Sequence, residues 1–307
     1  MSLVAEWRGV SKHYRGVTAV HDVSLGLEAG QATALVGHNG AGKTTLIKLL
    51  LGLVRPSAGT VGILGTDPAG RRGASVRRSI GFLPESVAFH GAMTGRELMA
   101  FYARLKGEPL DLNGELLARV GIADVANRRV ATYSKGMRQR LGIAQALIGA
   151  PRLLLFDEPT SGLDPASRRD VYEMIDALRA SGTTVLISTH ALAEIESRVD
   201  RMAIMHRGRL LAAGTLSELR HGADAEVSMQ LRVRPCTSGQ VLATLPPQVR
   251  CVERSDARLT LTMPLPAKMA ALGAVVRAGE AVEDIEMTAP GLPELYARLV
   301  GNAQEPA

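Results

Sequence analysis

One stretch of this chain is more informative than any other: Gly37-His38-Asn39-Gly40-Ala41-Gly42-Lys43-Thr44. It matches the pattern GxxxxGK[ST] and lies between an apolar run, Ala32 to Val36, and a helical pattern from Gly42 to about Leu51. Glycines let a backbone wrap closely around a phosphate, and N–H groups of the turn and the following helix point at the anion. The flanks favour a phosphate-binding loop over a glycine-rich turn with a chance lysine. Lys43 is expected to reach the phosphates, and the Thr44 hydroxyl to ligate Mg²⁺.

An acidic pair follows a second apolar run, Leu153 to Phe156. Asp157 and Glu158 come directly after this predicted strand, at the end where ligands bind in parallel α/β sheets. A carboxylate in the position of Asp157 can hold the water shell of Mg²⁺. Glu158 is suited to polarise a water that attacks a phosphate. The alternative is a strand that merely ends in an acidic turn, which the complete phosphate loop disfavours.

Two further features narrow the prediction. Tyr133-Ser134-Lys135-Gly136-Met137-Arg138-Gln139 leads into a predicted helix, Gly136 to Ile148, and its start forms a second anion-binding surface. His190 follows a predicted strand, Thr183 to Ser188, where it is placed to sense a terminal phosphate. Taken alone, such a histidine is more often a surface or capping residue.

Strands and helices alternate over most of the chain, which predicts an α/β fold around a parallel sheet. Alternation at Val23 to Leu27 indicates an early strand, and residues 85–131 have a mostly helical pattern. Near residue 217 the pattern changes to that of a small α+β domain. The other predicted elements are Ala166 to Ala180, Ala191 to Arg198, Val227 to Val233, Leu259 to Thr262, Ala267 to Arg277, Asp284 to Met287 and Leu292 to Val300.

Composition excludes several classes of protein. Of the 307 residues, 46% are hydrophobic and 21% charged, which excludes a disordered or fibrous chain. No apolar run approaches the roughly 18 residues of a membrane span. Met1 to Val10 lacks the pattern of a secretory signal, so we expect a cytosolic chain with Cys236 and Cys251 reduced. The net charge is +6 but only 3% of residues are aromatic, so no nucleic acid partner is expected.

The sequence resembles the ATP-binding cassette (ABC) ATPases in the order and spacing of four features: the phosphate loop, the Tyr133 to Gln139 segment, Asp157 to Thr160, and His190. The resemblance covers residues 1 to about 220 and implies an α/β P-loop ABC ATPase fold. Its expected parts are a parallel-sheet core, an antiparallel β subdomain, a helical subdomain at about 85–150 and, at 221–307, an accessory α+β domain.

The resemblance also implies ATP and Mg²⁺ as cofactors and a homodimer of cassettes. Each ATP would lie between the phosphate loop of one subunit and the Ser134 to Gln139 segment of the other, with Asp164 at the junction. Tyr14 would stack on adenine, unless it is simply a solvent-facing tyrosine. The implied catalytic residues are Glu158, His190 and Lys43, and the implied metal ligands are Thr44, Asp157 and Glu85. The implied ATP-binding residues are Tyr14, Gly37, His38, Asn39, Gly40, Ala41, Gly42, Lys43, Thr44, Thr45, Glu85, Ser134, Lys135, Gly136, Gln139 and Asp164.

Two positions depart from the family pattern. The signature usually reads L-S-G-G-Q, whereas this chain has Tyr133-Ser134-Lys135-Gly136-Met137, which keeps the serine and the second glycine. A glutamine is usual where this chain has Glu85. A glutamate there keeps an oxygen for Mg²⁺ but adds negative charge beside ATP.

A narrower resemblance is to the NosF-type ATPases, which serve the transporter that helps mature the copper centres of nitrous-oxide reductase. It rests on G-H-N-G-A-G-K-T-T, L-P-E-x-V-x-F, A-R-L-K-G and T-Y-S-K-G-M-R-Q-R-L-G, and on the tail at Glu283 to Glu286 and Leu292 to Tyr296. It implies an integral membrane transporter subunit that docks beside Phe82 to Tyr102, a periplasmic maturation factor, and a place on the inner face of the membrane. Copper itself is not expected to bind this chain, since no cluster has metal-ligand spacing.

Other functions stay open at this point. A drug- or ion-export ATPase would have the same architecture. A soluble cassette protein of translation would need two cassettes, and one of DNA repair a long coiled coil, of which the sequence shows neither. The C-terminal domain could be a ligand sensor or a dimerisation module.

Overall fold

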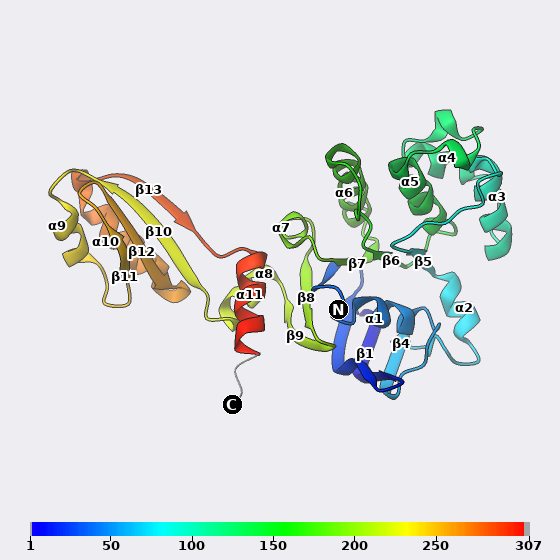
Figure 1. The fold of residues 1–307 in the computed structure, drawn as a ribbon, viewed down its shortest axis with the longest axis horizontal. Helices are drawn as coiled ribbons and strands as arrows, with labels where there is room; N and C mark the ends of the chain where they lie inside the picture. Colours follow the sequence, from blue (N-terminus) through cyan, green and yellow to red (C-terminus); the bar gives the residue numbers. More distant parts are fainter. Residues whose placement is uncertain (1, 304–307) are drawn as a thin grey trace. The chain divides into compact units, whose positions relative to one another are not determined.

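The computed structural model describes residues 2–303, which form two compact units (Figure 1). Unit 1 ends at Ala213 and unit 2 begins at Gly214. The boundary expected near residue 220 falls within helix α8 (Leu216–Gly222), which belongs to unit 2. The physical reason is that α8 packs on α11 (Leu292–Asn302), and the Arg220 Nε donates a 2.8 Å hydrogen bond to the carbonyl oxygen of Pro290.

A six-stranded sheet forms the centre of unit 1, in the order β5-β6-β7-β3-β8-β9. β3 (Ala32–Val36), β6 (Leu153–Asp157) and β7 (Thr184–Thr189) are buried along their whole length, as in parallel sheets covered on both faces. These strands pair in parallel, so their carboxyl ends share one edge of the sheet. The outer strands are β5 (Ile80–Leu83), β8 (Arg201–His206) and β9 (Arg209–Gly214).

A three-stranded antiparallel sheet lies beside it in unit 1, in the order β2-β1-β4. Its strands are β1 (Leu3–Tyr14), β2 (Val17–Glu28) and β4 (Ala58–Ile63). The alternation at Val23 to Leu27 therefore marks only the second half of a 12-residue strand.

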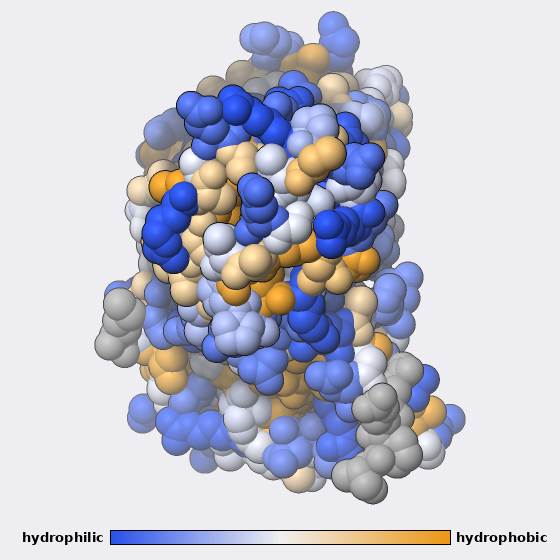
Figure 2. Space-filling model, turned by 90° about the vertical axis from the view of Figure 1, so that its left-hand side faces the viewer, coloured by the Kyte–Doolittle hydropathy of each residue, from blue (hydrophilic) through white to orange (hydrophobic). Residues whose placement is uncertain are grey.

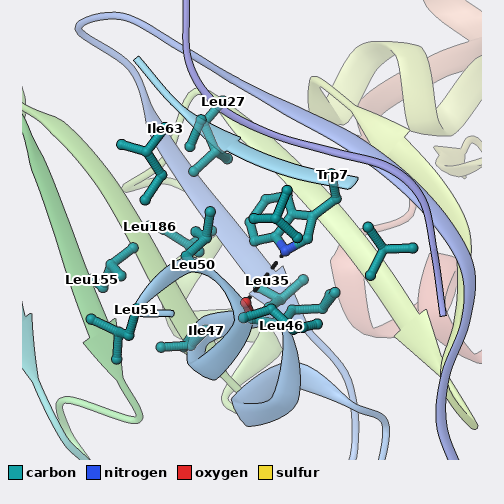
Figure 3. Packing of buried hydrophobic residues seen from close by; sticks show 14 of the residues in the cluster. Trp7, Leu27, Leu35, Leu46, Ile47, Leu50, Leu51, Ile63, Leu155 and Leu186 are labelled. Atoms are coloured by element: carbon teal, nitrogen blue, oxygen red, sulfur yellow. Dashed lines mark hydrogen bonds between the residues drawn. The ribbon is translucent and has the colours of Figure 1, made fainter. Parts of the chain in front are cut away.

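Helix α1 (Lys43–Leu50) shares one hydrophobic core with both sheets (Figure 3). Trp7 of β1 is 1% exposed, and its Nε1 donates a 3.3 Å hydrogen bond to the carbonyl oxygen of Leu46. Leu50 lies in the same core and is fully buried. Because the phosphate loop leads directly into α1, this packing fixes the helix that supports the loop.

The helical part of unit 1 contains α3 (Gly95–Lys106), α4 (Asn113–Arg119) and α5 (Lys135–Ala146). Residues 85–94 are not helical, contrary to the mostly helical pattern expected from residue 85. α3 starts only after Thr94, whose side chain and Glu97 form a capping box. The other helices of unit 1 are α2 (Gly73–Arg78), α6 (Pro165–Ala180), α7 (Leu192–Ile195) and 3-10 turns at Ala123–Val125 and Val130–Thr132.

Unit 2 contains a four-stranded antiparallel sheet in the order β11-β12-β10-β13. Its chain order, β10-α9-β11-β12-α10-β13, is the βαββαβ arrangement of ferredoxin-like folds. Alternate residues of β10 and β12 pack with α9 and α10, which gives unit 2 a core of its own. The elements are β10 (Glu226–Val233), α9 (Ser238–Thr244), β11 (Arg250–Arg254), β12 (Arg258–Pro264), α10 (Lys268–Arg277) and β13 (Val282–Thr288), with 3-10 turns at Leu265–Ala267 and Gly279–Ala281.

The surface in Figure 2 is mostly hydrophilic, with small hydrophobic areas between the polar residues. Among residues 2–303, none of the helices has the length and apolar character that crossing a bilayer requires.

Candidate active site

The loop between β3 and α1 excludes side chains at two of its glycines. Gly42 has a φ of 103°, and a Cβ there would lie 2.6 Å from the carbonyl oxygen of Ala19. At Gly37 a Cβ would lie 2.5 Å from the carbonyl oxygen of Met205. Gly37 and Gly42 are therefore a steric requirement of this fold.

A cleft of about 440 Å³ opens over the start of α1. α1 has no side-chain cap at Gly42, so its first backbone N–H groups remain available to an anion. The cleft brings together most of the predicted ATP-binding residues of the loop and adds three residues of β2. The lining residues are Val17, Thr18, Ala19, His38, Asn39, Gly40, Ala41, Gly42, Lys43, Thr44, Thr45, Glu85 and Glu158.

Lys43 lies at the floor of this cleft, with 6% of its side chain exposed. Its Nζ donates a 2.6 Å hydrogen bond to the carbonyl oxygen of Gly37 and lies 3.2 Å from a carboxylate oxygen of Glu158. A buried ammonium group at the start of a helix is an arrangement that attracts phosphate.

Asp157 ends β6 with its carboxylate directed towards α1. One of its oxygens accepts hydrogen bonds from the Thr44 hydroxyl, at 3.5 Å, and from the Ser188 hydroxyl. A hydroxyl and a carboxylate at the edge of a phosphate cleft fit Mg²⁺, which uses few protein ligands and completes its shell with water and phosphate oxygens. The described residues contain no cluster of three or more His, Cys, Asp or Glu placed to hold a metal.

Glu158 has an uncommon backbone for a residue with a side chain, with a φ of 48°. Its backbone N–H is held by the carbonyl oxygen and the hydroxyl of Ser188, at 3.1 and 3.0 Å. One carboxylate oxygen lies 2.8 Å from the His190 Nδ1. The other is buried and accepts no hydrogen bond, although Lys43 Nζ is 3.2 Å away. The carboxylate thus lies at the cleft, held between the Lys43 ammonium group and the His190 ring.

Ser188 is the functional residue that sequence reasoning missed. It is fully buried near the end of β7, and it holds both Asp157 and Glu158. The available signal is a hydroxyl that interrupts the apolar part of the strand Thr-Val-Leu-Ile-Ser-Thr.

The signature segment lies at the start of α5 and does not line the cleft of its own chain. Ser134 caps α5 by accepting a 3.2 Å hydrogen bond from the Met137 N–H. Gln139 Nε2 donates a 2.7 Å hydrogen bond to the carbonyl oxygen of Pro159, next to Glu158. The segment is therefore tied to the loop that follows the acidic pair.

Two more close approaches join this segment to the same loop and to the start of α6. A Cβ at Gly136 would lie 2.6 Å from the Ser167 hydroxyl, and the Lys135 Nζ lies beside Gly162. Asp164 caps α6, and hydrogen bonds from the backbone and side chain of Ser167 hold the pKa of its carboxyl below the usual value. The exposed carboxylate is thus anionic at neutral pH, outside the cleft.

Tyr14 ends β1 and is not among the residues that line the cleft. Its side chain is 39% exposed, and the Lys12 Nζ lies 5.0 Å from the ring centroid. Its strand partner Val17 does line the cleft, so the ring lies near the margin of the site.

Comparisons with known proteins agree with this geometry. Residues 20–161 match the family model described as "ABC transporter". The chain is 36% identical over 303 residues to the daunorubicin resistance ATP-binding protein DrrA3 of Streptomyces coeruleorubidus, covering 96% of this chain and 95% of that protein.

Solved structures give the same result. A structure titled as the ATP binding subunit of an ABC transporter is 32% identical, with a TM-score of 0.65, and covers 72% of this chain and 93% of its own. The structure of cbiO1 from Clostridium perfringens, described as part of the ABC transporter complex cbiONQ, is 25% identical, with a TM-score of 0.66, and covers 72% of this chain and 92% of its own.

Proposed function

The chain belongs to the ABC transporter family as an ATP-hydrolysing cassette, and on this premise we propose that it powers an exporter whose membrane-spanning subunit is a separate chain. The observation that carries the hydrolytic part of the proposal is the carboxylate of Glu158, held at the phosphate-loop cleft between Lys43 and His190. The description of cbiO1 as part of a complex supports a separate membrane partner. We place the chain on the cytoplasmic face of the membrane, held there by that partner.

Different residues of the cleft bind the phosphates of ATP, neutralise their charge and hold the metal ion. Backbone N–H groups of the phosphate loop and of α1 bind the phosphates of ATP, and Lys43 neutralises their charge. Thr44 and Asp157 would hold Mg²⁺, which supplies further charge neutralisation when bound. Glu85, which lines the same cleft, is the third proposed ligand, and its negative charge makes the site more dependent on the cation.

Glu158 acts as the general base of hydrolysis. A water attacks the terminal phosphorus, its proton passes to the Glu158 carboxylate, and the bond to the ADP oxygen breaks. His190, 2.8 Å from the carboxylate, orients it and is the proposed sensor of the terminal phosphate. Lys43 must exchange its contact with Glu158 for one with phosphate oxygens, so ATP binding itself frees the base.

A second copy of the chain would complete each site. Ser134, Lys135, Gly136, Gln139 and Asp164 do not line the cleft of their own chain, although Ser134 and Gly136 sit at a helix start suited to phosphate. In the proposed homodimer they face the ATP held by the other subunit. Tyr14, at the margin of the cleft, is the proposed adenine contact.

Two cargoes are proposed in order. Export of a toxic compound comes first, because a relative that matches over nearly the whole chain is a drug-resistance protein by name. The NosF-type role in copper-centre maturation, with its periplasmic factor, comes second, because only the sequence motifs support it.

A deletion strain separates these two cargoes. Deleting the gene should raise sensitivity to amphiphilic toxic compounds, and the wild-type chain, but not Glu158→Gln, should restore resistance. Nitrous-oxide reductase activity should be unchanged in the same strain. Loss of that activity with unchanged sensitivity would instead assign the copper-maturation role.

A further inference from the structure

A segment of unit 1 outside the cleft concentrates positive charge. Residues 68–84 contain four arginines and no Asp or Glu. The segment includes α2, which buries Gly73 and Val76, so that the arginines stay on the exposed side. They are Arg71, Arg72, Arg77 and Arg78.

Three of these arginines have guanidinium groups without a hydrogen-bond or ion-pair partner among residues 2–303. Arg77 is different, because it donates a hydrogen bond to the carbonyl oxygen of Pro68 and so holds the loop before α2. Arg152 joins the group, since its backbone N–H donates a 2.9 Å hydrogen bond to the carbonyl oxygen of Ser79, next to Arg78. We define the arginine patch as Arg71, Arg72, Arg78 and Arg152.

No carboxylate within residues 2–303 forms an ion pair with the arginine patch. Some other arginines of unit 1 do form ion pairs: Arg168 with Glu194, Arg179 with Asp200, and Arg198 with Asp176. The patch therefore gathers four arginines that no carboxylate of the described residues neutralises by an ion pair.

An exposed apolar side chain lies beside the patch. Leu53, in the turn after α1, is 67% exposed. The turn packs on the loop before α2, because a Cβ at Gly52 would lie 2.4 Å from the carbonyl oxygen of Pro68. Basic side chains around an exposed leucine are typical of surfaces that contact the headgroup region of a membrane.

We infer that the arginine patch and Leu53 bind the anionic phospholipid headgroups of the membrane that holds the partner subunit. The inference rests on the proposed function, because a cassette docked on a membrane subunit lies close to a bilayer. Guanidinium groups bind phosphate oxygens through two N–H donors at once. Residues 53–81 contain no aromatic side chain, so the stacking that single-stranded nucleic acid needs is missing.

The test is sedimentation of the purified full-length chain with lipid vesicles, without the membrane subunit. Binding is expected to vesicles of phosphatidylglycerol and phosphatidylcholine, to fall with added NaCl, and to be weak on phosphatidylcholine alone. Each basic residue near an anionic surface strengthens binding about fivefold, so Arg71→Gln/Arg72→Gln should weaken it about 25-fold. Arg77 is left intact because it holds the loop.

The chain offers a matched control in a second exposed arginine pair. Arg128→Gln/Arg129→Gln removes the same charge from the helical part of unit 1 and should leave vesicle binding within about twofold. Equal losses in the two variants, binding that ignores phosphatidylglycerol, or tighter binding to a DNA oligonucleotide than to the vesicles would each overturn the inference. Both variants should keep wild-type ATP hydrolysis. If the chain binds phosphatidylglycerol vesicles but has no ATPase activity, the proposed function is contradicted, whereas the inference that the arginine patch binds lipid headgroups is still supported.

Discussion

Glu158 and Asp157 depend on a residue that lies far from them in sequence. The Ser188 hydroxyl donates a hydrogen bond to Asp157 and accepts one from the Glu158 N–H. The contiguous motifs around Lys43 and Asp157 could be interpreted from sequence because their spacing is local. The role of Ser188 could not be predicted from sequence, because it follows from the pairing of β6 with β7, in which Asp157 lies opposite Ser188.

Replacing Ser188 with alanine should lower the turnover number for ATP about tenfold to a hundredfold. The variant loses a hydrogen bond to a charged group, which is worth about 1.5–3 kcal/mol, and the Glu158 backbone loses a partner. ATP affinity, measured by calorimetry, should change less than turnover, because Lys43 and the loop remain. Ser181→Ala removes a hydroxyl at the end of α6 and serves as the control. Equal turnover in both variants would exclude a positioning role for Ser188.

At the scale of elements, the regular helices were predictable from periodicity and stop signals. α6 (Pro165–Ala180) and α10 (Lys268–Arg277) each begin within one residue of the predicted start and end at the predicted residue. The prediction of a mostly helical pattern from residue 85 was wrong for residues 85–94, because the helix begins only after its N-cap at Thr94. The pairing order of the unit 2 sheet could not be predicted, because it depends on contacts between distant strands.

Helix α1 also depends on contacts between distant parts of the chain, because packing against the two sheets stabilises it. Leu50 of α1 is fully buried, whereas Leu105 of α3 is 68% exposed. Leu50→Ala should lower the free energy of unfolding by about 2–5 kcal/mol, and Leu105→Ala by less than about 0.5 kcal/mol. Urea unfolding followed by circular dichroism measures both. Similar values for the two variants would contradict the core described for unit 1.

The whole molecule combines an ATPase unit with a ferredoxin-like unit that has its own core. The family and the ATPase fold could be predicted because the motifs are contiguous and ordered. The cargo could not be predicted from the sequence, because no residue of a cassette contacts the cargo in the proposed arrangement. The NosF-type assignment rests on sequence motifs alone. The proposed completion of each site by a second copy would be a property of the assembly, and the sequence of one chain only implies it.

Glu158→Gln tests the central claim most directly, with ATP binding, hydrolysis and molecular mass measured on one preparation. The variant should bind ATP with affinity close to wild type. Its rate of ATP hydrolysis should fall about 10²–10⁴-fold because the general base is missing, so the protein should accumulate as an ATP-bound dimer. Lys43→Ala, in the same assays, should lose about tenfold or more in ATP affinity because a charge-assisted contact is missing. A Glu158→Gln variant that stays monomeric in ATP and hydrolyses it at the wild-type rate would contradict the account.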